Sequence, residues 1–177
     1  MADCCTGLAA IEKACGGGNT PGLKTKLRVA CVDEVTTIPA PDADTLTISG
    51  DITMRASDVG PPAVAAGTFK EWSISKINGT WTVEAVGEGE NISYNVTVNA
   101  FINKIDPARS YILNSATGGE FIVIAEDKNG QKRLVGDIDD GCSIKVGEQT
   151  NDANGYPVVI EWTVNHLPYF YTGAITV

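Results

Sequence analysis

The chain has 177 residues, of which 43% are hydrophobic and 20% charged, so it is long enough to form one domain around a buried core. Its 13 basic and 22 acidic residues give a net charge of −9, which argues against a nucleic-acid-gripping surface, because phosphate contacts need clustered lysine and arginine. With one histidine, and with no run of eighteen apolar residues, we expect neither an enzyme nor a membrane contact, and no cofactor or metal.

Residues 1–22 are predicted to form an amino-terminal arm, followed by a single β domain over residues 23–177. Three of the five cysteines, Cys4, Cys5 and Cys15, lie in this arm. The odd number of cysteines and the lack of a recognisable export signal favour reduced thiols and a cytosolic protein. The cysteines also lack the Cys-x-x-Cys spacing and the neighbouring histidines that a zinc site needs.

Two strands are predicted after the arm, over residues 23–32 and 45–54. In the first strand, Lys24, Lys26 and Arg28 share one face. Three cations in register could contact a polyanion. More often such a row is the solvated face of an edge strand, where lysine discourages unwanted pairing, and we favour that interpretation.

The connection over residues 56–67 is longer than most connections in compact domains, which suggests a functional segment. It contains four apolar residues that a freely solvated loop would not select, and we expect them to contact another subunit: Val59, Pro61, Pro62 and Val64.

Three Asn-Gly pairs, at positions 78–79, 129–130 and 154–155, separate runs of alternating apolar residues. Both residue types tolerate positive φ, so each pair predicts an antiparallel hairpin with a two-residue turn. A glycine-spaced stretch that follows the first pair carries three carboxylates: Glu84, Glu88 and Glu90.

The longest alternation in the chain runs over residues 91–102. Its even positions, from Ile92 to Ile102, are apolar, and its odd positions as far as 99 are polar: Asn91, Ser93, Asn95, Thr97 and Asn99. This pattern predicts a strand with one buried and one wet face. The strand is long compared with the roughly five or six residues that are typical of globular proteins.

One helix is predicted after this strand, because Asp106 supplies an N-cap, Pro107 suits the first turn and the glycines at 118–119 end the helix. The carboxylates of Asp137, Asp139 and Asp140 do not match the spacing of a calcium loop, so we expect a turn there. His166 is predicted to be structural or exposed, since no nucleophile is recognisable as its partner.

Several segments together resemble a known family. The segment CGGGNTPGLKTKLRVA, the long alternating strands, the capped helix, FIVIAEDKNGQKRLVG and DANGYPVVIEWTVNHLPYFYTG are similar to the tail-tube (major tail) proteins of tailed bacteriophages, particularly those of Bacteroidetes hosts. The resemblance implies a mainly β fold, an antiparallel β-sandwich or partial barrel with one flanking α-helix.

The resemblance also implies a virion structural protein that self-assembles in the host cytoplasm into stacked, hexameric rings. These would form the tail tube, a conduit through which double-stranded DNA passes in transit. The strand over residues 91–102 would be a stave of the inner barrel, and the three glutamates would give an acidic lumen. The loop and the arm would contact neighbouring subunits, and the further partners would be the tape measure and the tail terminator.

Two alternatives to a tail-tube subunit remain. One is another phage structural part, such as a head–tail connector or a capsid decoration protein. The other is a β-sandwich carbohydrate-binding module, which would expose Trp72, Trp81 or Trp162 along a groove, because sugars stack on aromatic faces.

Overall fold

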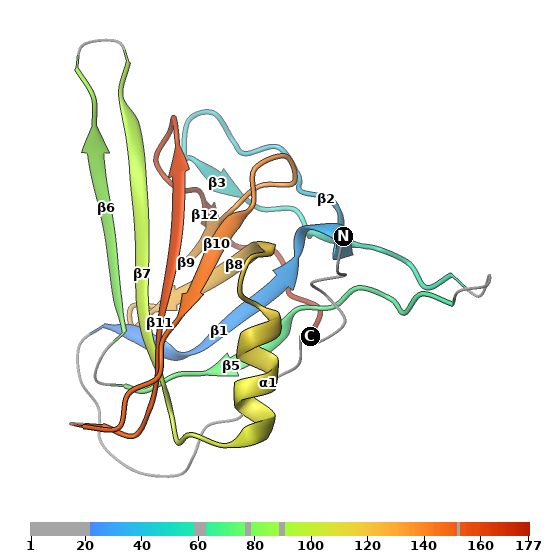
Figure 1. Ribbon diagram of the computed structural model, residues 1–177. Helices are drawn as coiled ribbons and strands as arrows, with labels where there is room; N and C mark the ends of the chain where they lie inside the picture. The colour runs from blue at the N-terminus through green and yellow to red at the C-terminus, as the bar shows by residue number, and fades with distance from the viewer. Residues whose placement is uncertain (1–21, 59–62, 77–78, 89–90, 152) are drawn as a thin grey trace.

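A computed structural model describes residues 22–58, 63–76, 79–88, 91–151 and 153–177 (Figure 1). All of the predicted arm except Gly22 lies outside these residues, and so do Val59, Pro61, Pro62 and Glu90.

The described part of the chain is mainly β, with one α-helix. Its elements are, in chain order, β1 (Leu23–Cys31), the 3-10 helix η1 (Val32–Glu34), β2 (Val35–Thr37), β3 (Thr47–Ile48), β4 (Thr53–Met54), β5 (Lys70–Ser73), β6 (Thr80–Val86), β7 (Ser93–Asn103), α1 (Pro107–Ser115), β8 (Glu120–Asp127), β9 (Lys132–Val135), β10 (Cys142–Val146), β11 (Gly155–Val164) and β12 (Phe170–Tyr171).

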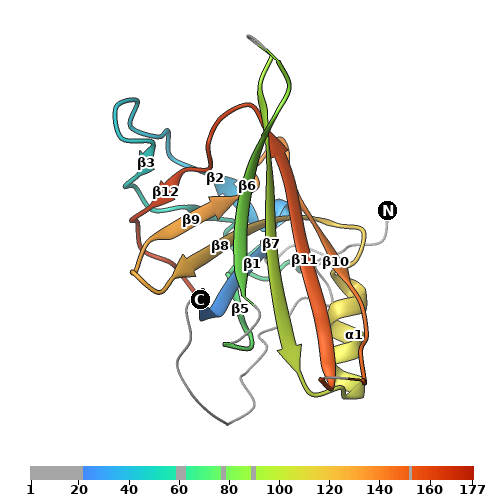
Figure 2. The same cartoon turned by 90° about the vertical axis from the view of Figure 1, so that its left-hand side faces the viewer.

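The strands form two layers that share β8 (Figures 1 and 2). One layer has the order β10-β11-β7-β6, and the other places β1 between β5 and β8 and continues through β9 to β12 and β3. Strand β8 pairs with β10 at its first two residues and with β9 from Val123 onward. All pairs are antiparallel except β12–β3, so the predicted sandwich or partial barrel with one helix is confirmed.

The two layers also approach each other at their far side, as expected for a partial barrel. After β5, the main-chain N–H of Ser75 donates to the carbonyl of Phe101 on β7 at 2.6 Å. The guanidinium of Arg133 on β9 lies 5.7 Å from the ring centre of Trp81 on β6. These contacts hold β6 and β7 against the second layer without a continuous ladder.

Strand β8 contributes to two hydrophobic cores. Phe121, Val123 and Ala125 point into the larger core, between the layers and against α1, whereas Ile122 and Ile124 point into a smaller core on the other face. The smaller core is covered by β2, β3, β4 and β12 with their connections. Burying a large side chain stabilises the fold by roughly 1.5–3 kcal/mol, so β8 is anchored from both of its faces.

Gly136 permits this branched pairing. Its φ is +93°, and a Cβ at this position would lie 2.5 Å from the carbonyl oxygen of Phe121. Only glycine tolerates both conditions, so the chain leaves β9 and returns as β10 along the same edge of β8.

The cysteines differ in part from the expectation. Cys142 is free and fully buried, its Sγ donates to the Phe121 carbonyl at 3.0 Å, and burial strongly raises the pKa of its thiol. Such a thiol forms little thiolate and is inert. Cys31, however, is disulfide-bonded, so the prediction of reduced thiols is wrong for this residue.

Three predictions about strands are wrong, because neither a row of cations nor proximity in sequence determines which strands pair. Strand β1 is not an edge strand, since it pairs with both β5 and β8. Strands β5 and β6, which flank the first Asn-Gly pair, do not pair with each other: β5 pairs with β1, and β6 pairs with β7. The predicted strand over 45–54 is two separate short strands, β3 and β4.

The other two Asn-Gly pairs have different outcomes. The β8–β9 hairpin is confirmed, with Gly130 at φ +85°, but the N–H of Asp127 donates to the carbonyl of Gln131, so its turn has three residues and not the predicted two. Strands β10 and β11 also pair as predicted, but Gly155 already belongs to β11 and bridges Gln149, so their connection is longer than two residues.

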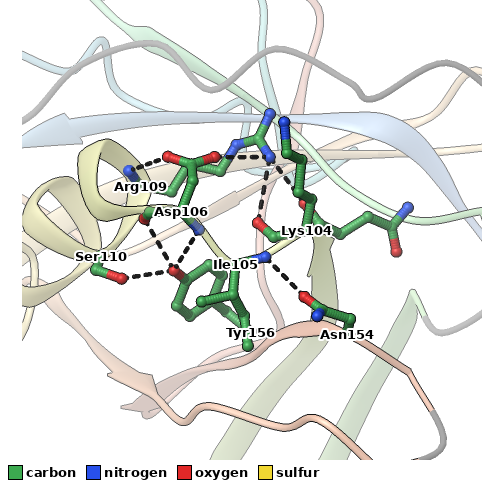
Figure 3. Close-up of polar contacts among 8 residues, drawn as sticks. Lys104, Ile105, Asp106, Arg109, Ser110, Asn154 and Tyr156 are labelled. Atoms are coloured by element: carbon green, nitrogen blue, oxygen red, sulfur yellow. Dashed lines mark hydrogen bonds and ion pairs between the residues drawn. The ribbon is translucent and has the colours of Figure 1, made fainter.

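The predicted helix is confirmed as α1, and Asp106 is its N-cap (Figure 3). The Oδ1 of Asp106 accepts from the N–H of Arg109 at 2.9 Å. The hydroxyl of Tyr156 on β11 lies 2.6 Å from Oγ of Ser110 and accepts from the N–H of Asp106 at 3.2 Å. The Oδ1 of Asn154 accepts from the N–H of Ile105 at 2.9 Å. The start of α1 is thereby fixed to β11.

Candidate assembly surfaces

The first surface is the outer, polar face of the β10-β11-β7-β6 layer. Strand register places Glu84 of β6 and Thr163 of β11 on either side of Asn95 of β7. One step along, Thr97 lies between Thr82 and Glu161. Because side chains alternate across a strand, all these residues share one face of the sheet.

Side-chain hydrogen bonds join the strands across this polar face. Thr163 Oγ1 donates to Asn95 Oδ1 at 2.9 Å, and Asn99 Nδ2 donates to Thr80 Oγ1 at 3.1 Å. Such cross-strand pairs each contribute roughly 0.2–1 kcal/mol and keep the strands in register.

The opposite face of the same layer is apolar. Val96 and Val98 of β7 are 1% and 0% exposed, and Ile160 of β11 is 0% exposed, within the larger core. The predicted alternation is therefore present over β7, with Asn91 lying just before the strand. The structure thus presents a long sheet with a polar outer face.

The polar face is weakly acidic. Within the described strands of the layer it carries two carboxylates, Glu84 and Glu161, and one cation, Lys145, which pairs with Glu161. Glu84 is exposed, and Glu88 is exposed in the turn beyond β6. Glu84 is therefore the carboxylate that gives this face its net negative charge.

The second surface is the free edge at β6. This strand ends the sheet, and among the described residues it pairs with β7 alone. The β6–β7 hairpin projects beyond the rest of the layer (Figures 1 and 2). Near its tip, Val86 is 49% exposed and Ile92 is 41% exposed. An exposed strand edge with apolar side chains readily pairs with another chain.

The third surface is a second projecting arm, whose described residues are 55–58 and 63–67 (Figure 1). Its stem is bonded to the body and to itself: the N–H of Arg55 donates to the carbonyl of Glu34 at 2.8 Å, and the N–H of Gly67 to the carbonyl of Arg55 at 2.8 Å. Asp58 and Val64 exchange two main-chain bonds of 2.9 Å each. Val64, the one member of the predicted contact set that is described, is therefore held half-buried by β bridging.

The tryptophans do not form a sugar-binding platform. Trp72 is fully buried, and Trp81 lies half-buried beside Arg133. Trp162 is 6% exposed and its Nε1 donates to Asp140 at 3.2 Å. It lines a small cleft of about 230 Å³ together with Tyr169.

His166 stacks on Tyr169 with ring centres 4.2 Å apart, which is a packing contact. The described residues contain no group of three or more His, Cys, Asp or Glu side chains placed to hold a metal ion. They also contain no helix that is long and apolar enough to cross a membrane.

Sequence analysis found the β7 part of the polar face but missed the contribution of β11. The alternation over β11 was visible, but nothing in the sequence states that Glu161 and Thr163 lie beside β7 rather than beside another strand. The stem of the arm was also missed, because main-chain hydrogen bonds hold it together and such bonds do not require particular residue types.

Comparison of the chain with family models, with curated proteins and with solved structures gives no match.

Proposed function

We propose that this protein is a virion structural subunit that self-assembles into stacked, hexameric rings and forms the tail tube of a phage. The observation that carries the proposal is the long β10-β11-β7-β6 layer, which combines a polar outer face with a free edge on a projecting hairpin.

A free β edge is an aggregation hazard in a monomer, but repetition about an axis removes it, because each edge then meets the next subunit. Within a ring, β6 of one subunit would lie beside the next copy, and the polar faces would together line a lumen. The apolar tip residues Val86 and Ile92 would be buried in the same contact.

Rings built in this way have free upper and lower faces, so they can stack. The arm, of which residues 55–58 and 63–67 are described, projects from the body and would reach a neighbouring subunit or ring. Glu84, repeated around the axis, would line the lumen with negative charge and discourage DNA from adhering during passage. The tape measure would occupy the lumen during assembly, and the tail terminator would cap the tube.

The test is electron microscopy of the purified full chain over a range of concentrations. Hollow rods of uniform width are the expected result. Isolated rings that do not stack would favour a head–tail connector instead. A protein that stays monomeric in sedimentation at high concentration, including with the other tail proteins present, would overturn the proposal.

A further inference from the structure

The outer face of β1 carries a groove that is strongly basic for a chain of net charge −9. The groove has a volume of about 370 Å³, and the charged residues that line it are Lys24, Lys26, Arg28, Lys76, Lys128 and Glu126. We refer to these residues as the basic groove.

Carboxylates within the molecule neutralise the basic groove only in part. Lys24 pairs with Glu126, Lys26 pairs with Glu71, and Arg28 lies 3.8–3.9 Å from an oxygen of each glutamate. Lys76 is engaged by a partner of its own, and among the described residues the other four cations face two carboxylates, Glu71 and Glu126, which leaves an excess of two positive charges. The side chains of Lys24 and Lys26 remain 47% and 52% exposed. Exposed ion pairs contribute little to stability, so these lysines can take another partner at small cost.

The opposite end of β8 carries the complementary charge. Glu126 at the basic groove and Glu120 are separated by six residues of β8, or about 20 Å at the rise of a strand. Beside Glu120 lies the exposed turn between β9 and β10, closed by a bond from the N–H of Asp137 to the carbonyl of Asp140 at 2.9 Å. The acidic turn, as we name it, comprises Glu120, Asp137, Asp139 and Asp140.

We propose that the basic groove receives the acidic turn of a second copy of this chain. The charges are complementary, and the two patches lie at opposite ends of one rigid strand, so a bound copy presents its own basic groove to the next. Such a heterologous contact repeats from subunit to subunit. A second copy fits better than nucleic acid, since Glu126 lies within the groove, Glu71 pairs with two of its cations, and the whole chain would repel a polyanion.

This inference rests on the proposed self-assembly and specifies one of its contacts. It also replaces the earlier interpretation of the lysine row in β1. The row does not protect an edge strand, because β5 and β8 pair with the two edges of β1. Its charge is explained instead by an acidic partner.

The first test uses the unmodified chain. Sedimentation and electron microscopy at 50 mM and 500 mM salt measure the critical concentration for assembly. This concentration should be higher at 500 mM salt by about tenfold or more, because salt screens the attraction between surface charges. Assembly that is equally strong at both salt concentrations would overturn the inference and leave the proposed function intact. A chain that is monomeric at every salt concentration would overturn both.

The second test exchanges the charges. Lys24→Glu/Lys26→Glu and Glu120→Lys/Asp139→Lys should each assemble at least about tenfold more weakly than the parent, because like charges would face each other. A mixture of the two variants should recover assembly, since each then offers the patch that the other needs. Asp44→Lys/Glu148→Lys, which changes the charge by the same amount at two other exposed positions, should assemble like the parent.

Circular dichroism and thermal unfolding establish that each variant is folded before it is compared. Failure of the mixture to recover assembly would overturn the inference. Binding of duplex DNA that is lost in Lys24→Glu/Lys26→Glu while assembly is unchanged would assign the basic groove to nucleic acid and would also overturn it.

Discussion

Asp106 shows how a single carboxylate can place a helix on a sheet. It caps α1 through Oδ1, forms an ion pair with Arg109 at 3.1 Å, and offers its own N–H to Tyr156 (Figure 3). We expect Asp106→Ala to lower the free energy of unfolding by about 1–2 kcal/mol, because the first turn loses its side-chain acceptor. Urea denaturation measures this change.

The matched control is Asp106→Asn, which retains a capping oxygen but not the charge. It should cost only about 0.3–0.5 kcal/mol, the usual contribution of an ion pair at this spacing on a helix. Equal losses in the two variants would contradict the cap. The cap itself was predictable, since Asp-Pro is a local signal, but its partner Tyr156 lies 50 residues away and was not.

The β6–β7 hairpin projects beyond the rest of its layer, further than the packing of a monomer requires. Val86 and Ile92 are two of the five large hydrophobic residues that are exposed among the described residues, and both lie near its tip. We expect Ile92→Asp to leave the free energy of unfolding within about 0.5 kcal/mol of the parent, since little burial is lost in the monomer. Assembly should weaken by about tenfold, the equivalent of about 1.4 kcal/mol.

Leu167→Asp is the control for this prediction, because Leu167 is 45% exposed and lies outside the hairpin. Its assembly, followed by light scattering, should match that of the parent. If Ile92→Asp assembles as well as Leu167→Asp, the hairpin tip is not part of the contact.

At the level of elements, periodicity predicted the secondary structure of most segments but not which strands pair with each other. The two-residue alternation gave β7 almost to its ends, and Asn129-Gly130 gave the β8–β9 hairpin. The partners of β1 and β5 depend on contacts across about fifty and a hundred residues, for which the sequence carries no local signal. The free edge was expected at β1 and lies at β6 instead.

For the whole molecule, the charge of the polar face would determine whether duplex DNA binds to an assembled tube. In the proposed tube, Glu84→Lys would change the charge of the lumen by two units per subunit, and we expect tubes of this variant to bind duplex DNA at low salt and release it as salt is raised. Filter binding at several salt concentrations measures this behaviour. Glu148→Lys, an equal change in the loop after β10, should bind no more DNA than the parent, and equal binding by both variants would contradict a lumen lined by Glu84.

Strand β8 belongs to both hydrophobic cores, and both of its edges are paired. We therefore expect the two cores to unfold together rather than one after the other. In the proposed tube, a subunit under tension would then yield as a single body.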